Sequence, residues 1–207
     1  DDGTATQIAD LSTFYQANPT ENMNEADFEP DGTPYNMITV DGNLYVVEPN
    51  HGSLEQVTPT GEITRIIDIS AEAGHSVPTA VGYHDNFFVG NLSIFPVPAH
   101  AAQIMQISPD GQVQHVTPSL TAVTGLAFDE QDRLYALETT TVNGELPIPG
   151  TGTIVRVDLD SGELVEIATG LAFPTAMTFG PDGMLYVSNY GFGFPPGAGE
   201  IVKVALP

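Results

Sequence analysis

The sequence predicts an all-β protein, a β-propeller with four visible blades that are each expected to be a four-stranded antiparallel sheet. Three observations support this prediction: one motif recurs along the whole chain, apolar and polar residues alternate within short segments, and turn signals separate those segments. Strict alternation is typical of half-buried strands. A repeat of about 45 residues with four short strands per unit is typical of propeller blades.

The recurring motif is a turn that contains Asp, followed by bulky apolar residues and then a polar residue. Its four copies are Asp41–Glu48, Asp85–Asn91, Asp132–Glu138 and Asp182–Asn189. The aromatic positions 45, 88, 135 and 186 lie 43, 47 and 51 residues apart. We interpret each copy as the second strand of a blade together with the turn that leads into it.

The segments on either side of this motif supply the other strands. A first strand precedes each turn, and a third strand follows at Leu54–Val57, Ile104–Ile107, Ile154–Val157 and Ile201–Val204. The first three of these lead into hairpin signals such as Pro109-Asp110-Gly111 and then into an outer strand. The predicted blades span residues 34–70, 77–118, 123–169 and 173–207, within a single domain of residues 1–207.

The two ends of the repeat leave two architectures open. The last unit stops after its third strand, whereas residues 1–11 resemble a hairpin turn and an outer strand without a third strand before it. Residues 1–11 therefore belong either to the last blade, closing a four-bladed ring, or to a preceding blade. In the second case the chain is the C-terminal part of a roughly six-bladed propeller, which we favour because an unfinished blade leaves a bare edge. Residues 12–33 are an insertion, with a short helix over Leu11–Ala17 capped by Ser12.

Composition excludes several classes of function. The chain of 207 residues carries 27 acidic and four basic side chains, for a formal net charge of −23. Nucleic-acid binding is excluded because it requires clustered cations, and no apolar run approaches the ~20 residues of a membrane helix. The absence of Cys excludes thiolate chemistry and disulfides. An acidic surface suits saline surroundings, so we expect an extracytoplasmic location, periplasmic or extracellular.

Several segments resemble the ScyD/ScyE family of bacterial NHL-like propellers. The resemblance covers essentially the whole chain and rests on the segments Ile8–Phe14, Thr33–Asn36, Ser76–Val81, Leu126–Phe128 and Gly180–Gly191, together with the Pro-rich insertions 92–102 and 143–152. It implies a propeller fold and export, and it implies no particular reaction. In that family the segment similar to Ile8–Phe14 lies after one or two earlier blades, which is consistent with the longer propeller.

One oxygen-bearing side chain ends the second strand of each predicted blade. These residues are Glu48, Asn91, Glu138 and Asn189. Equivalent positions in a propeller ring the axial mouth, and converging oxygen donors are what Ca²⁺ requires. The calcium-dependent gluconolactonase-type propellers use a similar set. The alternative is that these side chains cap the strand ends by bonding to neighbouring backbone.

The loops on the same face are long, apolar and rich in Pro. We predict a ligand-binding surface there, formed by Phe95, Pro96, Pro98, Tyr190, Phe192 and Phe194. Exposed apolar loops mark contact surfaces, and stiff loops lower the entropic cost of binding. The alternative is that the loops pack on one another. The His residues of these loops, His51, His75 and His100, have no metal-like spacing, and we assign no catalytic residue.

Three hypotheses on function follow from these patterns. The first is a non-catalytic binding module that presents its loops to a protein partner or an apolar small molecule. The second is a Ca²⁺-dependent hydrolase or lyase of gluconolactonase-like type. The third is a structural subunit of an extracellular assembly, in which the unfinished blade mediates self-association.

Overall fold

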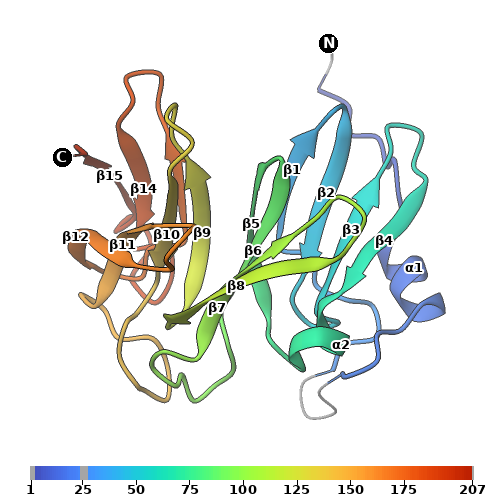
Figure 1. Ribbon diagram of the computed structural model, residues 1–207, viewed down its shortest axis with the longest axis horizontal. Helices are drawn as coiled ribbons and strands as arrows, with labels where there is room; N and C mark the ends of the chain where they lie inside the picture. The colour runs from blue at the N-terminus through green and yellow to red at the C-terminus, as the bar shows by residue number, and fades with distance from the viewer. Residues whose placement is uncertain (1–2, 24–27, 207) are drawn as a thin grey trace. The chain divides into compact units, whose positions relative to one another are not determined.

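The structure, a computed structural model that describes residues 3–23 and 28–206, confirms the all-β propeller fold. Within these residues, fifteen strands form four antiparallel sheets, and the only helices are two short ones (Figure 1). Three sheets have four strands in sequential order and the last has three, as the repeat predicts. No helix of the described residues is long and apolar enough to cross a membrane.

Each sheet is formed by strands that are consecutive in the sequence. The first sheet contains β1 (Asn36–Val40), β2 (Asn43–Glu48), β3 (Ser53–Val57) and β4 (Ile63–Asp68). The second contains β5 (Pro78–His84), β6 (Asn86–Asn91), β7 (Ala102–Ile107) and β8 (Val113–Leu120). The third contains β9 (Val123–Phe128), β10 (Leu134–Glu138), β11 (Gly152–Val157) and β12 (Leu164–Leu171). The last contains β13 (Ala176–Phe179), β14 (Leu185–Asn189) and β15 (Glu200–Val204).

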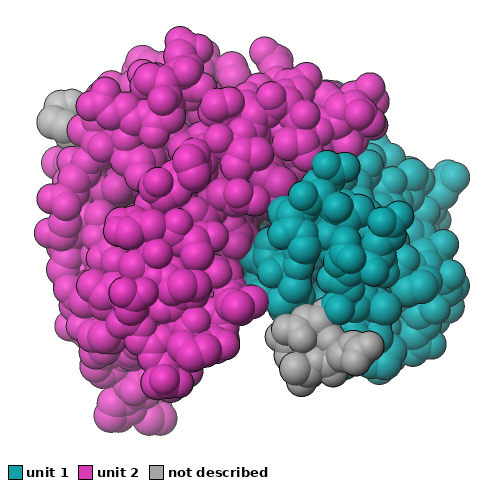
Figure 2. Space-filling model, turned by 60° about the horizontal axis from the view of Figure 1, so that its bottom comes forward, with its two compact units in different colours: residues 1–77 teal, residues 78–207 magenta. Residues whose placement is uncertain are grey.

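The chain divides into two compact units, residues 1–77 (unit 1) and residues 78–207 (unit 2), which Figure 2 shows in teal and magenta. Unit 1 holds the first sheet and unit 2 holds the other three. The boundary between the units falls after residue 77, the residue at which the second blade was predicted to begin.

The core of unit 2 lies between neighbouring sheets. Along β10, Leu134 and Ala136 pack into one apolar cluster with Phe88 and Ile104 of the second sheet. The alternate residues of β10 pack into another cluster, with Leu185 and Val187 of the last sheet. Because successive side chains of a strand point to opposite faces, the third sheet is covered on both sides, as expected for an inner blade.

The first strands of the three sheets of unit 2, β5, β9 and β13, begin at the same end of the unit. Thr79, near the start of β5, donates from Oγ1 to the carbonyl of Val123, the first residue of β9, at 2.6 Å. Thr124 donates in the same way to the carbonyl of Pro174, just before β13, at 3.3 Å. The first strands therefore begin side by side, and the loops between second and third strands open at one end of unit 2. We call this end the loop face; it carries residues 92–101, 139–151 and 190–199.

In unit 1 the structure before the first sheet differs from the prediction at the helix cap. Helix α1 (Leu11–Ala17) forms as expected, but its N-cap is Asp10, which accepts a hydrogen bond from the Thr13 N–H, and not Ser12. Residues 3–10 form no strand in this structure, and the outer strand predicted for residues 1–11, as part of a preceding or the last blade, stays a prediction. Within the predicted turn at residues 1–4, Asp1 and Asp2 lie outside the described residues, as do part of the insertion 12–33 and the final residue of the last blade.

Candidate functional site

The four predicted metal ligands share one local role. Each ends the second strand of its sheet, is buried and accepts a hydrogen bond from a backbone N–H. The donors are Thr33, Asn50 and His51 to Glu48, Gln103 to Asn91 at 2.7 Å, Thr121 to Glu138 at 2.7 Å and Ala172 to Asn189 at 2.8 Å. These contacts tie a strand end to a neighbouring segment, which is the capping role that the sequence left open as the alternative.

The four predicted ligands differ in how well their oxygen atoms could bind a calcium ion. Glu48 accepts four hydrogen bonds, three from backbone N–H groups and one from the Thr33 hydroxyl; three of them fall on Oε1 and one on Oε2, so the carboxylate has little accepting capacity left. Glu138 accepts one, and its burial raises the pKa of its carboxyl group although the Thr121 N–H opposes the shift. The described residues contain no group of three or more His, Asp or Glu arranged for a metal ion. The calcium site stays a prediction, and Glu48 is its least suited member.

An aromatic cluster stands on the loop face of the last sheet. Phe173, which precedes β13, stacks on Phe192 with ring centroids 4.4 Å apart and an angle of 15° between the rings. Phe194 packs against Phe173 at 5.6 Å and meets the Tyr190 ring edge-on at 4.6 Å. Although they contact other rings, Phe192 and Phe194 remain 43% and 38% exposed. The cluster therefore presents aromatic surface to solvent in a fixed arrangement.

The backbone beneath this cluster is strained. Phe173 and Tyr190 have positive φ angles of 48° and 54°, a region that bulky side chains rarely adopt and that costs about 1–3 kcal/mol per residue. Two backbone hydrogen bonds hold this geometry, from the Tyr190 N–H to the Ala172 carbonyl at 2.8 Å and from the Gly191 N–H to the Phe173 carbonyl at 3.0 Å. Strain that the surrounding structure maintains is typical of functional sites.

The other two loops of this face are joined to each other. Val97 and Gly144 exchange backbone hydrogen bonds of 2.7 Å and 3.2 Å, and the Ala99 N–H donates to the Asn143 side chain at 2.7 Å. The two loops lie side by side at the lower end of Figure 1. Val97 is buried by this pairing, whereas neighbouring apolar side chains point outward. The exposed ones are Ile94, Phe95, Val142, Leu146 and Ile148.

The structure brings together only part of the predicted ligand-binding set. Tyr190, Phe192 and Phe194 form the aromatic cluster, whereas Phe95, Pro96 and Pro98 lie on the loop that pairs with residues 139–151. Phe95 is 52% exposed, Pro96 is exposed and Pro98 is half-buried. The sequence analysis missed Phe173, although its position before Pro174 matches that of Val77 before Pro78, where the backbone also has a positive φ.

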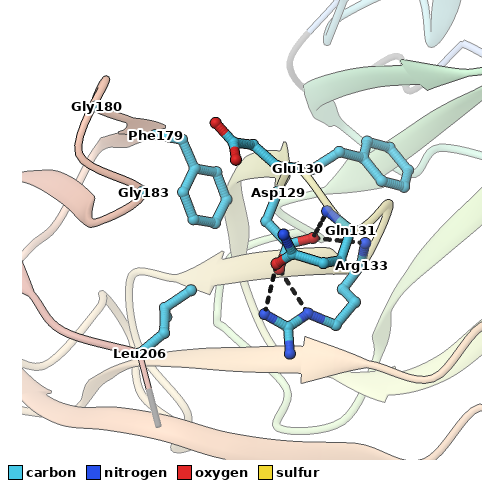
Figure 3. Close-up of a pocket in the computed structure, with 9 residues that line it drawn as sticks. Asp129, Glu130, Gln131, Arg133, Phe179, Gly180, Gly183 and Leu206 are labelled. Carbon is cyan, nitrogen blue, oxygen red and sulfur yellow. Dashed lines mark hydrogen bonds and ion pairs between the residues drawn. The ribbon is translucent and has the colours of Figure 1, made fainter.

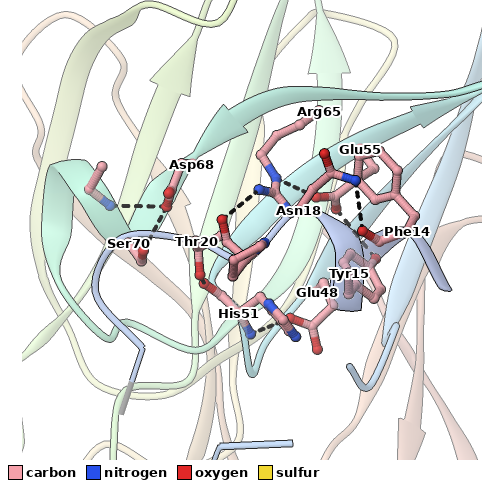
Figure 4. A network of polar contacts seen from close by, with 12 residues as sticks. Phe14, Tyr15, Asn18, Thr20, Glu48, His51, Glu55, Arg65, Asp68 and Ser70 are labelled. Atoms are coloured by element: carbon pink, nitrogen blue, oxygen red, sulfur yellow. Dashed lines mark hydrogen bonds and ion pairs between the residues drawn. The ribbon is translucent and has the colours of Figure 1, made fainter. Parts of the chain in front are cut away.

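Unit 1 contains a buried polar cluster that the sequence analysis also missed (Figure 4). Glu55 is fully buried on β3, where its Oε1 accepts from Nε of Arg65 at 3.0 Å and its Oε2 accepts from the Tyr15 hydroxyl at 3.4 Å. The Tyr15 ring stacks on His51 at 5.0 Å, and neither ring nitrogen of His51 has a hydrogen-bond partner among the described residues. Burial raises the pKa of Glu55 to about 7, against the effect of Arg65. The cluster joins α1 to the sheet.

At the opposite end of unit 2 from the loop face, a cavity of about 370 Å³ lies between the β9–β10 and β13–β14 turns (Figure 3). Its walls include Phe128, Phe179 and Leu206, and its polar part centres on Asp129. Burial alone would raise the pKa of Asp129. Hydrogen bonds from Arg133 and other donors outweigh this effect, so that the pKa of Asp129 lies below its usual range. Because Asp129 neutralises Arg133, the cavity offers no free cation to an anionic ligand.

Comparison with known proteins supports the fold and no more. No protein family and no curated protein matches this chain. Solved propellers are similar at low identity. A catalytically inactive virginiamycin B lyase from Staphylococcus aureus is 16% identical with a TM-score of 0.58, and the match covers 85% of this chain and 56% of the lyase. A putative gluconolactonase is 13% identical with a TM-score of 0.58, over 84% of this chain and 63% of that one.

A putative oxidoreductase (glucose dehydrogenase) from Thermus thermophilus is 16% identical with a TM-score of 0.58, over 86% of this chain and 67% of that one. The chain thus spans a little over half of the lyase and about two thirds of the other two. The chain is a β-propeller protein, and these likenesses leave its activity open.

Proposed function

We propose that this protein is an exported, NHL-like propeller of the ScyD/ScyE type that acts as a binding module through the loop face of unit 2. The observation that carries the proposal is where apolar surface is exposed. Of the eleven large apolar side chains that are exposed among the described residues, seven lie on the three equivalent loops of this face. Apolar residues concentrated in this way mark an interaction site rather than the usual scatter of surface side chains.

The ligand class follows from the chemistry of these side chains. The exposed residues are aromatic or aliphatic, and none of the four basic residues of the chain lies on the three loops. The chemistry suits an apolar small molecule or an apolar segment of a protein partner, and aromatic side chains contribute large contact areas at low entropic cost. The paired loops and the stacked rings lower the entropy that binding would otherwise cost.

The metal-dependent hydrolase or lyase is the second candidate. The buried Glu138 with its raised pKa favours it, as do the solved propellers that are named as a lyase and as a putative gluconolactonase. We rank it below the binding module because each of the four candidate ligands already accepts a backbone hydrogen bond.

The test is ligand-observed NMR with a set of neutral aromatic compounds as probes. We expect compounds that bind the wild-type protein to lose most of their signal with Phe192→Ser and Phe194→Ser, because each change removes an exposed ring from the cluster. The control is Met37→Ser, since Met37 is 61% exposed but lies on β1 of unit 1. Equal binding by all four proteins would contradict the proposal.

A further inference from the structure

The aromatic cluster on the loop face has exposed rings and no cation of its own. Phe192 stacks one face of its ring on Phe173 and is still 43% exposed, so its other face is turned to solvent. The face of an aromatic ring is the negative part of its quadrupole and attracts a cation that lies within about 6 Å of the ring centre. Among the described residues, none of the four basic side chains of the chain lies over a ring of this cluster.

Elsewhere in the molecule, aromatic rings do hold cations. Nζ of Lys203 lies 5.4 Å from the centroid of the Tyr186 ring and 2.5 Å from a carboxylate oxygen of Asp182. The guanidinium carbon of Arg65 lies in the same way over the Phe14 ring, at 5.5 Å. The contacts of Lys203 show what such a site consists of in this protein: a ring face, a carboxylate and a cation that touches both.

A carboxylate is anchored at the base of the aromatic cluster. Asn189 donates from Nδ2 to Oε1 of Glu200 at 2.9 Å, and its Oδ1 accepts from the Ala172 N–H at 2.8 Å. Asn189 and Ala172 are each followed directly by a residue of the aromatic cluster, so these bonds fix Glu200 beside the backbone that carries the rings. Glu200 is exposed, and the structure gives it no basic partner among the described residues. The ring face and the carboxylate are thus both present without a cation.

We propose that the aromatic cluster and Glu200 bind the ammonium group of a small organic cation, a quaternary ammonium compound or a similar amine. The inference rests on the binding function proposed above and names the chemical class of its ligand. The ammonium group takes the place that Lys203 has beside Tyr186 and Asp182. Recognition of quaternary ammonium groups is a known use of aromatic rings in binding sites.

The charges of the loop face favour a cation over an anion. The three loops carry one carboxylate, Glu145, and no Lys or Arg. A phosphate group would therefore find no basic side chain to pair with on this face. A free ammonium compound suits the site for this reason, whereas a phospholipid headgroup, which joins its ammonium group to a phosphate, does not.

The test compares choline with 3,3-dimethylbutan-1-ol, which has the same shape but carries a carbon atom in place of the charged nitrogen. Each compound gives one intense methyl signal that ligand-observed NMR can follow. The titrations are made at physiological ionic strength, where the field of the net charge of −23 is screened beyond about 8 Å. We expect choline to bind about threefold more tightly than the alcohol. A purely apolar surface predicts the reverse, because the charged compound loses more hydration on binding.

Variants separate the rings and the carboxylate from the overall charge. Phe192→Leu and Phe194→Leu keep apolar surface and net charge but remove a ring, so the preference for choline should disappear. Glu200→Gln keeps an acceptor for Asn189 and should weaken choline binding by about twofold or more without changing that of the alcohol. The matched control is Glu163→Gln, an exposed carboxylate of the β11–β12 turn at the other end of unit 2, which should leave both compounds unaffected.

A preference for choline that persists in both Leu variants would overturn the proposal, because net charge alone would then explain it. Tighter binding of phosphocholine than of choline would also overturn it, since a headgroup would then be the better ligand. If choline has no advantage over the alcohol while neutral aromatic compounds still depend on Phe192 and Phe194, this inference fails and the proposed binding function stands. If none of these compounds binds, both fail.

Discussion

Replacing Tyr15 by Ala should lower the free energy of unfolding by about 3–5 kcal/mol, because it empties the space of a fully buried aromatic ring. The ring joins α1 to the first sheet through its contacts with His51 and Glu55. Gly32 lies so close that a Cβ there would come within 2.5 Å of the ring, which shows how tightly the site is packed. Urea unfolding followed by circular dichroism measures the effect.

Two variants separate the packing of Tyr15 from its hydroxyl group. Tyr15→Phe keeps the ring and removes only the hydrogen bond to Glu55, so its cost should be about 1 kcal/mol. Tyr35→Ala removes a tyrosine that is 53% exposed, and its cost should be smaller than that of Tyr15→Ala by several-fold. A loss for Tyr15→Ala no greater than that for Tyr35→Ala would contradict the buried position of Tyr15.

The Glu55→Gln variant should be more stable than the wild-type protein by about 3 kcal/mol at pH 8 and by less than about 1 kcal/mol near pH 5. Burial raises the pKa of Glu55 from 4.5 to about 7 in the folded state, so the folded protein binds this proton more tightly than the unfolded chain does. The contribution is fully present below pH 4.5, and it is lost as the pH rises through 7. Gln is neutral at every pH and keeps the stabilising neutral state.

The measurement is the free energy of unfolding of both proteins at several pH values between 5 and 8. The difference between the two curves isolates Glu55 from the other acidic groups of the chain. Glu72→Gln is the matched control, because Glu72 is an exposed carboxylate of the same unit, and its curve should run parallel to that of the wild-type protein. A parallel curve for Glu55→Gln as well would show that its carboxyl group is not buried as described.

The sheets could be predicted from the sequence because their signals are local and repeated. The alternation in Ile154–Val157 and the Asp-containing turn before Leu134 both depend on neighbouring residues, and the repeat supplied four independent copies of each. The outer strand predicted over Thr4–Leu11 stays a prediction. Residues 3–10 form no strand here, and a strand forms only where another strand is available to pair with it.

The candidate sites depend on contacts between distant residues and were predicted only in part. Phe192 and Phe194 were found because they stand in one short loop, whereas Phe173 joins them from another loop. Glu55 did leave a signal: the equivalent positions in the other third strands hold Met105, Val155 and Val202, so a carboxylate there interrupts an apolar series. Its partner Tyr15, from the insertion, could not be assigned without the fold.

The central claim, that the aromatic cluster forms a binding surface, is tested most directly by comparing Gly193→Ala with Gly197→Ala. Both glycines have positive φ angles, 74° and 88°, so both substitutions strain the same loop. A Cβ at Gly193 would lie 2.9 Å from the Phe173 ring, whereas a Cβ at Gly197 meets nothing within 4 Å. The measured quantity is the dissociation constant of a neutral aromatic compound that binds the wild-type protein.

We predict that Gly193→Ala weakens binding by about tenfold or more, which corresponds to about 1.4 kcal/mol, and that Gly197→Ala leaves it within about twofold. This result would show that the stacked arrangement of the rings, rather than the composition of the loop, determines binding. Equal dissociation constants for the two variants would contradict the claim that the aromatic cluster is the binding surface.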